Sequence, residues 1–263
     1  MEGQNIGFSN IYEDAKRAEA YSKLELPGTY YLAYRDLPKI MSAHVEGTGA
    51  LDFGCGTGRS TRFLQQLGFT AVGVDVSKEM LEKARETDPK GDYRLIADGD
   101  FSQFKPKTFD LVLSAFTFDN IPTMEKKVQI LRGTRGLLKS RGRIVNLVSS
   151  PEIYTHEWTS FSTKDFPENK HAKSGDKVRI IQTDTEDKRP VNDIIWTPEH
   201  YRETYREARL AIIETYKPLA KTTEPYRWVN ETRIAPWTIY VLRRHRKEKR
   251  QMHPARRVVV LKD

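Results

Sequence analysis

The sequence of 263 residues holds a single cysteine, Cys55, and lacks any long uninterrupted hydrophobic run. One cysteine excludes an internal disulfide and a metal site built from cysteines alone, and no metal site is predicted. Charged residues break the apolar runs well short of the ~20 residues that a membrane-spanning helix needs. The N-terminal MEGQNIGFSN lacks the basic and hydrophobic segments of a secretory signal. We therefore expect a cytoplasmic protein of a reducing compartment without a membrane partner.

Positive charge is concentrated at one end of the sequence. Residues 243–257 contain eight Lys or Arg and one Glu, and they carry nearly all of the formal net charge of +8. Such a run is usually a solvated tail and sometimes a tether to phosphate-rich partners. Because the rest of the chain is close to neutral, a small-molecule ligand is favoured over a nucleic acid. Docking of RNA or protein through the tail is the alternative, and the sequence indicates no oligomeric state.

Apolar, strand-like segments alternate with helical ones in the first part of the chain. Strands are expected at GALDFG, TAVGVDVS, YRLIADGDF, FDLVLSAF and RIVNLVSS. The intervening helices are expected at residues 59–67, 78–86 and 124–138. Strands that are apolar on both faces and joined by helices indicate an α/β fold with a parallel sheet covered by helices.

The remaining segments complete the predicted organisation. Residues 1–45 are expected to form an N-terminal helical cover. Residues 151–195 are polar, aromatic and irregular apart from the strand-like KVRIIQ, so they are interpreted as a substrate-side insertion or lid. After a helix at 198–208, LAIIETYKPL and PWTIYVLRRH form two strands whose short connection predicts antiparallel pairing. The prediction is one domain over residues 1–242, with a doubly wound, mostly parallel, seven-stranded sheet and an antiparallel last strand, before a basic tail at 243–263.

The segment LDFGCGTGRS joins the first predicted strand to the first helix and contains Gly54, Gly56 and Gly58. Glycines there leave bare backbone for a ligand, beside the free N–H groups of a helix N-terminus. Their spacing departs from the dinucleotide fingerprint Gly-x-Gly-x-x-Gly, which argues against a pyrophosphate-binding enzyme. Asp75 ends the second strand, where a carboxylate can accept hydrogen bonds from both hydroxyls of a ribose. Three alternate glycines alone also fit a tight turn.

LDFGCGTGRST together with VGVDVS resembles the class I, Rossmann-like S-adenosylmethionine-dependent methyltransferases. The resemblance covers about residues 50–148 and extends more loosely to 243. It implies S-adenosyl-L-methionine as methyl donor, S-adenosyl-L-homocysteine as product, and a sheet whose last two strands are antiparallel. It also places the glycine loop near the methionine part of the donor, Asp52 near its ammonium and Asp75 on its ribose. The C-terminal half is similar to stand-alone natural-product methyltransferases, including those that methylate nitrogen heterocycles.

Further contacts to the donor are implied by the same resemblance. Residues of ADGDF would face the adenine, Ser114 and Phe116 would border the reactive end, and an N-terminal helix would bring an aromatic residue and an Arg to the methionine part. The cofactor-binding residues expected in this way are Tyr21, Arg35, Asp52, Gly54, Cys55, Gly56, Gly58, Asp75, Val76, Met80, Asp98, Gly99, Asp100, Phe101, Ser114 and Phe116.

Several of these residues also have a simpler structural interpretation. Asp98 fits the cap of a turn, and Phe101 and Met80 fit core positions. Cys55 fits a small loop residue rather than a catalytic thiol, because no histidine is near it in sequence. Arg35 fits a surface ion-pair residue.

Methyl transfer from a sulfonium to an oxygen or nitrogen needs alignment more than a base, which helps only when the acceptor must lose a proton. The candidates for that role are Asp119, His156 and His171, although Asp119 also fits a turn cap and loop histidines are commonly solvent-exposed. The aromatic residues of the C-terminal half suit a flat, partly apolar metabolite, or ordinary packing. The predicted function is transfer of a methyl group to a small aromatic or heterocyclic molecule. RNA or protein methylation and non-catalytic binding of the donor are the alternatives.

Overall fold

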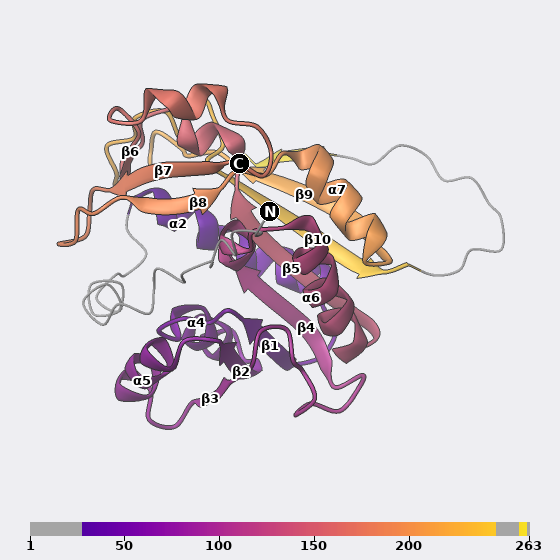
Figure 1. Ribbon diagram of the computed structural model, residues 1–263. Helices are drawn as coiled ribbons and strands as arrows, with labels where there is room; N and C mark the ends of the chain where they lie inside the picture. The colour runs from indigo at the N-terminus through magenta and orange to yellow at the C-terminus, as the bar shows by residue number, and fades with distance from the viewer. Residues whose placement is uncertain (1–27, 246–257, 262–263) are drawn as a thin grey trace, which may run out of the picture.

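A computed structural model describes residues 28–245 and 258–261, and Figure 1 shows a twisted central sheet with helices packed along it. Tyr21, the part of the predicted N-terminal cover before residue 28 and most of the predicted basic tail lie outside the described residues. None of the described helices is long and apolar enough to cross a membrane.

The main sheet has the strand order β11-β9-β10-β5-β4-β1-β2-β3. Its strands are β1 Gly49–Phe53, β2 Thr70–Asp75, β3 Asp92–Leu95, β4 Phe109–Ala115, β5 Leu138–Ser149, β9 Leu210–Pro218, β10 Trp237–Arg244 and β11 Val258–Leu261. Strands β1 to β5 pair in parallel, whereas β10 is antiparallel to both β5 and β9. The predicted mostly parallel sheet with an antiparallel last strand is therefore confirmed. In addition, β11 pairs in parallel with β9 at the edge, inside the segment predicted as a tail.

Helices connect the strands in the predicted alternation. Their bounds are α2 Thr29–Arg35, α3 Leu37–His44, α4 Arg59–Gln66, α5 Lys78–Thr87, α6 Met124–Leu137 and α7 Pro198–Glu207, with 3₁₀ turns η2 Thr117–Asn120, η3 Pro151–Tyr154 and η4 Pro167–His171. Side chains cap two of the helices: Ser77 Oγ accepts a hydrogen bond from Met80 N, and Thr123 Oγ1 accepts one from Lys126 N. Each cap satisfies a backbone N–H that has no partner within its helix.

The central strands β1 and β4 of the main sheet are buried on both faces. Adjacent residues of β1 show this, since Ala50 belongs to the hydrophobic cluster of α2 and α3, whereas Leu51 belongs to that of α6 and α7. Side chains alternate between the two faces of a strand, so an apolar run such as Ala50–Leu51 contributes to both layers. Helices cover the faces of the sheet, whereas loops meet at the carboxyl ends of β1, β2 and β4.

Residues 151–195 contain a second, three-stranded antiparallel sheet of β6 Phe161–Ser162, β7 Lys177–Gln182 and β8 Val191–Ile194. Strand β7 is the expected KVRIIQ, but two further strands accompany it where an irregular segment was expected. Two hydrogen bonds join this segment to α2: Thr29 N donates to Ser160 Oγ, and Ser160 N donates to Thr29 Oγ1. The small sheet is therefore fastened to the start of α2.

Glu231 connects three segments that are far apart in sequence. Its carboxylate is fully buried and accepts hydrogen bonds from Thr29 Oγ1 at 2.8 Å and Thr159 N at 2.7 Å through one oxygen. The other oxygen accepts from Val229 N at 2.8 Å and Asn230 N at 3.0 Å. This one side chain holds α2, the 151–195 segment and the loop between β9 and β10 together.

Replacing this carboxylate should destabilise the fold strongly. We expect Glu231→Ala to lower the free energy of unfolding by about 3 kcal/mol, because buried donors lose their acceptor. Glu203→Ala is the control, since Glu203 is an exposed residue of α7 that pairs only with Arg206 among the described residues and its loss should change stability by less than about 0.5 kcal/mol. Urea unfolding measures both, and equal effects of the two changes would contradict the role given to Glu231.

Candidate cofactor cavity and its neighbour

The glycine loop between β1 and α4 is shaped by close packing on one side and open space on the other. A Cβ atom on Gly54 would lie 2.1 Å from Thr117 Oγ1, which itself donates a hydrogen bond to Phe53 O. Gly56 has a φ of +52°, and the position of its missing Cβ has no described atom within 4 Å. Gly54 is thus required by the contact with Thr117, whereas Gly56 presents bare backbone to open space.

That open space belongs to a cavity of about 630 Å³ at the carboxyl ends of β1, β2 and β4. The volume lies in the range of small-molecule and cofactor sites. Half of the residues expected to bind a cofactor line this cavity, namely Gly54, Cys55, Gly56, Asp75, Val76, Met80, Asp98 and Phe116. Gly58 and Ser114 do not line it: Gly58 precedes α4 beside the ring of Tyr93, and Ser114 is buried within β4.

Asp75 links the glycine loop to the loop that follows β2. Its Oδ2 accepts a hydrogen bond from Gly56 N at 2.8 Å, and its Oδ1 accepts one from Ser77 N at 2.9 Å. Desolvation raises the pKa of Asp75, and the backbone N–H groups of Ser77, Gly56 and Val76 oppose this rise. Each carboxylate oxygen has more than one lone pair, so both oxygens retain capacity for the hydroxyl groups of a ribose.

Asp52 lies behind the cavity wall rather than on it. Its Oδ2 accepts hydrogen bonds of 2.6 Å from both Ser60 Oγ and Thr61 Oγ1, while its buried Oδ1 has no partner among the described residues. Burial raises the pKa of Asp52 from 3.8 to about 6, although the two hydroxyl groups favour its ionised form. Of these residues only Ser60 lines the cavity. The expected contact of Asp52 with an ammonium stays a prediction, and in this structure Ser60 lies between Asp52 and the cavity.

The wall expected to face the adenine differs from the prediction. Asp98 lines the cavity and forms an ion pair of 2.7 Å with Lys126 Nζ. Phe101 does not line it, because its ring packs in the core 5.7 Å from that of Phe53. Gly99 and Asp100 also lie outside the lining, and Asp100 Oδ1 instead accepts a hydrogen bond from Ser102 N.

Apolar residues that the sequence analysis missed complete this wall. They are Ile96 after β3, Ile121 after η2 and Ile130 on α6. Their branched side chains offer the apolar surface that a flat base needs on its faces. No local pattern marked them, since each is an isolated isoleucine on a different element.

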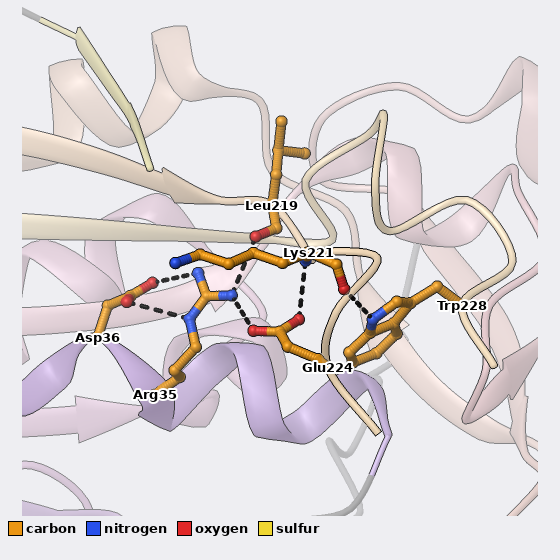
Figure 2. A network of polar contacts seen from close by, with 6 residues as sticks. All are labelled: Arg35, Asp36, Leu219, Lys221, Glu224 and Trp228. Carbon is orange, nitrogen blue, oxygen red and sulfur yellow. Dashed lines mark hydrogen bonds and ion pairs between the residues drawn. The ribbon is translucent and has the colours of Figure 1, made fainter. Parts of the chain in front are cut away.

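Arg35 does not line the cavity, and Figure 2 shows its guanidinium bound to other partners. Its guanidinium binds both carboxylate oxygens of Asp36, at 3.1 and 2.7 Å, and Glu224 Oε1 at 2.6 Å. It also donates to Leu219 O at 3.1 Å. The expectation that Arg35 pairs with a ligand carboxylate is therefore not supported, because these partners fasten α2 to the loop after β9.

A different arginine lines the cavity. Arg59, the first residue of α4, is on the cavity wall together with Tyr34, and its guanidinium lies 5.0 Å from the ring centre of Tyr30 and 5.8 Å from that of Tyr34. A guanidinium on the wall can bind a carboxylate. One indication in the sequence that Arg59 lines the cavity is that it directly follows Gly58, the third glycine of the loop.

A second, smaller cavity of about 40 Å³ adjoins the first and shares Phe116 and Asn120 with it. It is enclosed by the small sheet, by η3 and by the start of β10, through residues that include Tyr154, Gln182 and Trp237. Phe116, at the junction, has a φ of +63°, a left-handed conformation that is unfavourable for a side chain of this size. Strained residues of this kind occur preferentially at functional sites.

Of the three candidate bases, only Asp119 lines either cavity. Its Oδ2 accepts a hydrogen bond from Ser149 N at 3.0 Å, and its Oδ1 accepts one from Tyr201 OH at 3.3 Å. Burial raises its pKa. His156 instead contacts Glu152 O and Thr155 Oγ1, and His171 is exposed at the end of η4. Neither histidine lines either of these two cavities, so their role as a base stays a prediction.

Lys127 lies beside Asp119 in the protein interior. It is fully buried, and its Nζ donates to Phe118 O and lies 4.7 Å from the ring centre of Trp196. Burial lowers the pKa of Lys127, and the charges of Asp119 and Asp193 oppose this. Lys127 lines neither cavity. It balances part of the negative charge behind the second cavity.

Strand order 3-2-1-4-5, an antiparallel strand next to β5, and a glycine loop paired with an acid after β2 define a Rossmann-like methyltransferase fold. Comparison with known proteins agrees, since residues 51–146 match the model of the methyltransferase domain family. Residues 51–146 are thus similar to the methyltransferase domain family, and the fold is that of the class I, Rossmann-like methyltransferases, whose methyl donor is S-adenosylmethionine.

Relatives and solved structures show the extent of this similarity. An uncharacterized methyltransferase of Geobacillus sp. is 38% identical over 114 residues, which are 43% of this chain and 52% of the relative. A second one, from Geobacillus thermodenitrificans, is 36% identical over 146 residues, which are 52% of this chain and 65% of the relative. The chain thus spans between about half and two thirds of the length of these curated relatives.

Among solved structures, the CcbJ methyltransferase from Streptomyces caelestis superposes with a TM-score of 0.59 at 17% identity, covering 86% of this chain and 95% of that one. An S-adenosylmethionine-dependent methyltransferase from Clostridium acetobutylicum gives a TM-score of 0.57 at 15% identity, covering 87% and 98%. At these identities the likeness concerns the fold.

The residues of the larger cavity fit S-adenosylmethionine. Gly56 leaves space for a ligand at the backbone, Asp75 offers carboxylate oxygens, and Arg59 offers a cation for a carboxylate. Burial raises the pKa of the Cys55 thiol well above the ordinary value, which favours its protonated form.

The pKa of Asp52 predicts a pH-dependent effect on stability. A carboxyl whose folded-state pKa is raised binds its proton more tightly when folded, so its contribution is most favourable at low pH and is lost as the pH rises through 6. Asp52→Asn does not titrate. We therefore expect the stability of this variant, relative to the parent, to improve by about 2 kcal/mol from about pH 4.5 to about pH 7.

Urea unfolding at several pH values measures this difference. Asp92→Asn is the control, because Asp92 lies exposed at the start of β3 and is bound only by Arg94 among the described residues. A difference between Asp52→Asn and the parent that stays constant with pH would contradict the raised pKa.

Proposed function

We propose that this chain transfers the methyl group of S-adenosylmethionine to an oxygen or nitrogen of a small, aromatic or heterocyclic molecule. The observation that carries the proposal is the junction of two cavities at Phe116 and Asn120, one of the size of a cofactor and one enclosed by aromatic and polar side chains. Such a junction holds two molecules next to each other in a defined orientation, which is the main requirement of a displacement reaction.

The chain's own residues then have distinct tasks. Asp75 binds the ribose hydroxyls, Ile96, Ile121 and Ile130 contact the adenine, and Arg59 binds the carboxylate. The bound cofactor supplies an electrophilic methyl group on a sulfonium, so the protein has to orient the acceptor and exclude competing water. Phe116, between the two cavities, separates the two compartments and leaves one line of approach.

A small acceptor is favoured over a macromolecule by the depth of the second cavity. Its walls include Tyr154, Phe161 and Trp237, which are all almost fully buried. A flat RNA or protein surface does not reach such a place without a flipped or protruding group. The basic segment of residues 246–257, on which the alternative depends, lies outside the described residues.

Turnover tests the proposal directly. The full chain, supplied with S-adenosylmethionine and a panel of phenols, amines and nitrogen heterocycles, should release S-adenosylhomocysteine with at least one of them and give a methylated product by mass spectrometry. Transfer to RNA alone, with the steep salt dependence of phosphate contacts, would favour the alternative instead.

Binding of the cofactor tests the role of Asp75 separately. We expect Asp75→Ala to weaken the binding of S-adenosylmethionine by about 1 to 3 kcal/mol, since the ribose hydroxyls lose a charged acceptor. Asp92→Ala, on the neighbouring strand β3 and outside the cavity lining, should leave the affinity unchanged. Isothermal titration calorimetry measures both, and equal affinities of Asp75→Ala and the parent would contradict the assignment.

A further inference from the structure

The second cavity has a distinctive chemical character. Asp119 and Asp193 line it, and no Lys, Arg or His is among its described lining residues. Tyr154 OH donates a hydrogen bond of 3.2 Å to Asp193 Oδ2, which fixes one oxygen of that carboxylate. The buried Lys127 behind the cavity offsets part of the charge of these two carboxylates, and the charge that remains in a small space of low dielectric favours a positively charged occupant over an anionic one.

Gln182 gives an independent sign of a ligand. This residue of β7 lines the cavity and is only 3% exposed, yet its Nε2 has no hydrogen-bond partner in the described part of the chain. A buried amide that lacks a partner costs about 1 to 3 kcal/mol, so such groups are rare unless something else binds them. An acceptor atom of a bound molecule would satisfy it.

Aromatic rings form the rest of the enclosure. Tyr30, Phe116, Phe161 and Trp237 line the cavity and contact one another, with centroid distances from 4.6 Å between Phe116 and Trp237 to 5.8 Å. Ring faces attract a cation and exclude water from it. Lys127, the nearest buried cation, does not compete for the space, since its Nζ is bound to Phe118 O and lies over the ring of Trp196.

We propose, resting on the methyltransferase function above, that the methyl acceptor is a small primary or secondary amine whose nitrogen enters this second cavity. Asp193 and Asp119 receive the N–H groups of its ammonium form, and Gln182 Nε2 donates to a neighbouring oxygen or ring nitrogen of the same molecule. One water needs about 10–15 Å³, so the second cavity of about 40 Å³ has room for roughly three heavy atoms. The rest of the molecule extends into the larger cavity.

The reaction then balances without a further reagent. The ammonium gives one proton to Asp119, which frees the nitrogen lone pair. The lone pair forms the new N–C bond while the C–S bond of the donor breaks and its electron pair returns to sulfur, leaving a neutral thioether. The product leaves as a methylated ammonium ion, and Asp119 releases the proton that it accepted to water before the next turnover. Asp193 holds the nitrogen and Asp119 accepts the proton.

Matched probes test the class of acceptor. Benzylamine, phenethylamine and 2-(aminomethyl)pyridine are compared with the corresponding alcohols, first by calorimetric binding to the full chain saturated with S-adenosylhomocysteine and then by methyl transfer. We expect at least one amine to bind and react at least tenfold better than its alcohol. Inertness of every amine while the cofactor is bound overturns the inference, and so does preference for the alcohols. Transfer to alcohols or phenols alone would leave the proposed function intact, whereas failure to bind S-adenosylmethionine would overturn that function too.

Variants test the residues. Asp193→Asn and Gln182→Met should raise KM for the amine about tenfold to a hundredfold, by loss of a hydrogen bond to the ligand, with little change in cofactor affinity. Asp119→Asn should lower kcat more than it raises KM and should shift the pH profile, because the proton acceptor is lost. Asp184→Asn, an exposed residue two positions after Gln182, is the matched control and should behave as the parent. Parent-like KM values in the Asp193 and Gln182 variants, with circular dichroism showing that they fold, would overturn the assignment.

Discussion

The hydrogen bond from Gly56 N to the carboxylate of Asp75 is the contact on which the geometry of the site depends. It joins the loop after β1 to the loop after β2, and the second oxygen of the same carboxylate accepts from Ser77 N at the start of α5. The loops after β1 and β2, which begin two crossover connections of the parallel sheet, are thereby fixed relative to each other. The space between them, which the missing side chain of Gly56 leaves open, is the larger cavity.

This arrangement buries acidic groups, and their burial is energetically unfavourable. Burial raises the pKa of Asp52, of Asp75 and of Asp119, so each of these carboxylates is less favourable in its ionised form than it would be in water. Donors from Ser60, Thr61 and Ser149 offset part of that cost. Acids that are kept desolvated in this way interact strongly with any cationic ligand, since water screens them little. The carboxylates whose ionised form is destabilised by burial thus lie at or next to the two cavities.

The sequence predicted the parts of the site that depend on neighbours in the chain. The glycine loop and Asp75 follow directly from strands, and their positions in the cavity agree with the local pattern. Arg35 could not be placed, because its ion pair with Glu224 joins residues that are distant in sequence. Phe101 does not line the cavity, and its packing against Phe53 depends on the whole core, which the local sequence does not reveal. Gln182 carried no signal at all, because only the placement of the small sheet in the fold brings this ordinary strand glutamine to the wall of the cavity that Asp119 and Trp237 also line.

The backbone of Phe116 connects the two cavities structurally, because this residue lines both of them. Its backbone is held by two hydrogen bonds, from its own N–H to Leu147 O and from Asp119 N to its carbonyl, so the turn after β4 is fixed despite the unfavourable φ of +63°. The conformation directs the chain into η2, which places Thr117 against the glycine loop and Asp119 at the second cavity. A relaxed backbone at this position would separate those two contacts. The strained turn at Phe116 therefore brings the contact of Thr117 with the glycine loop and the carboxylate of Asp119 at the second cavity within one short turn of each other.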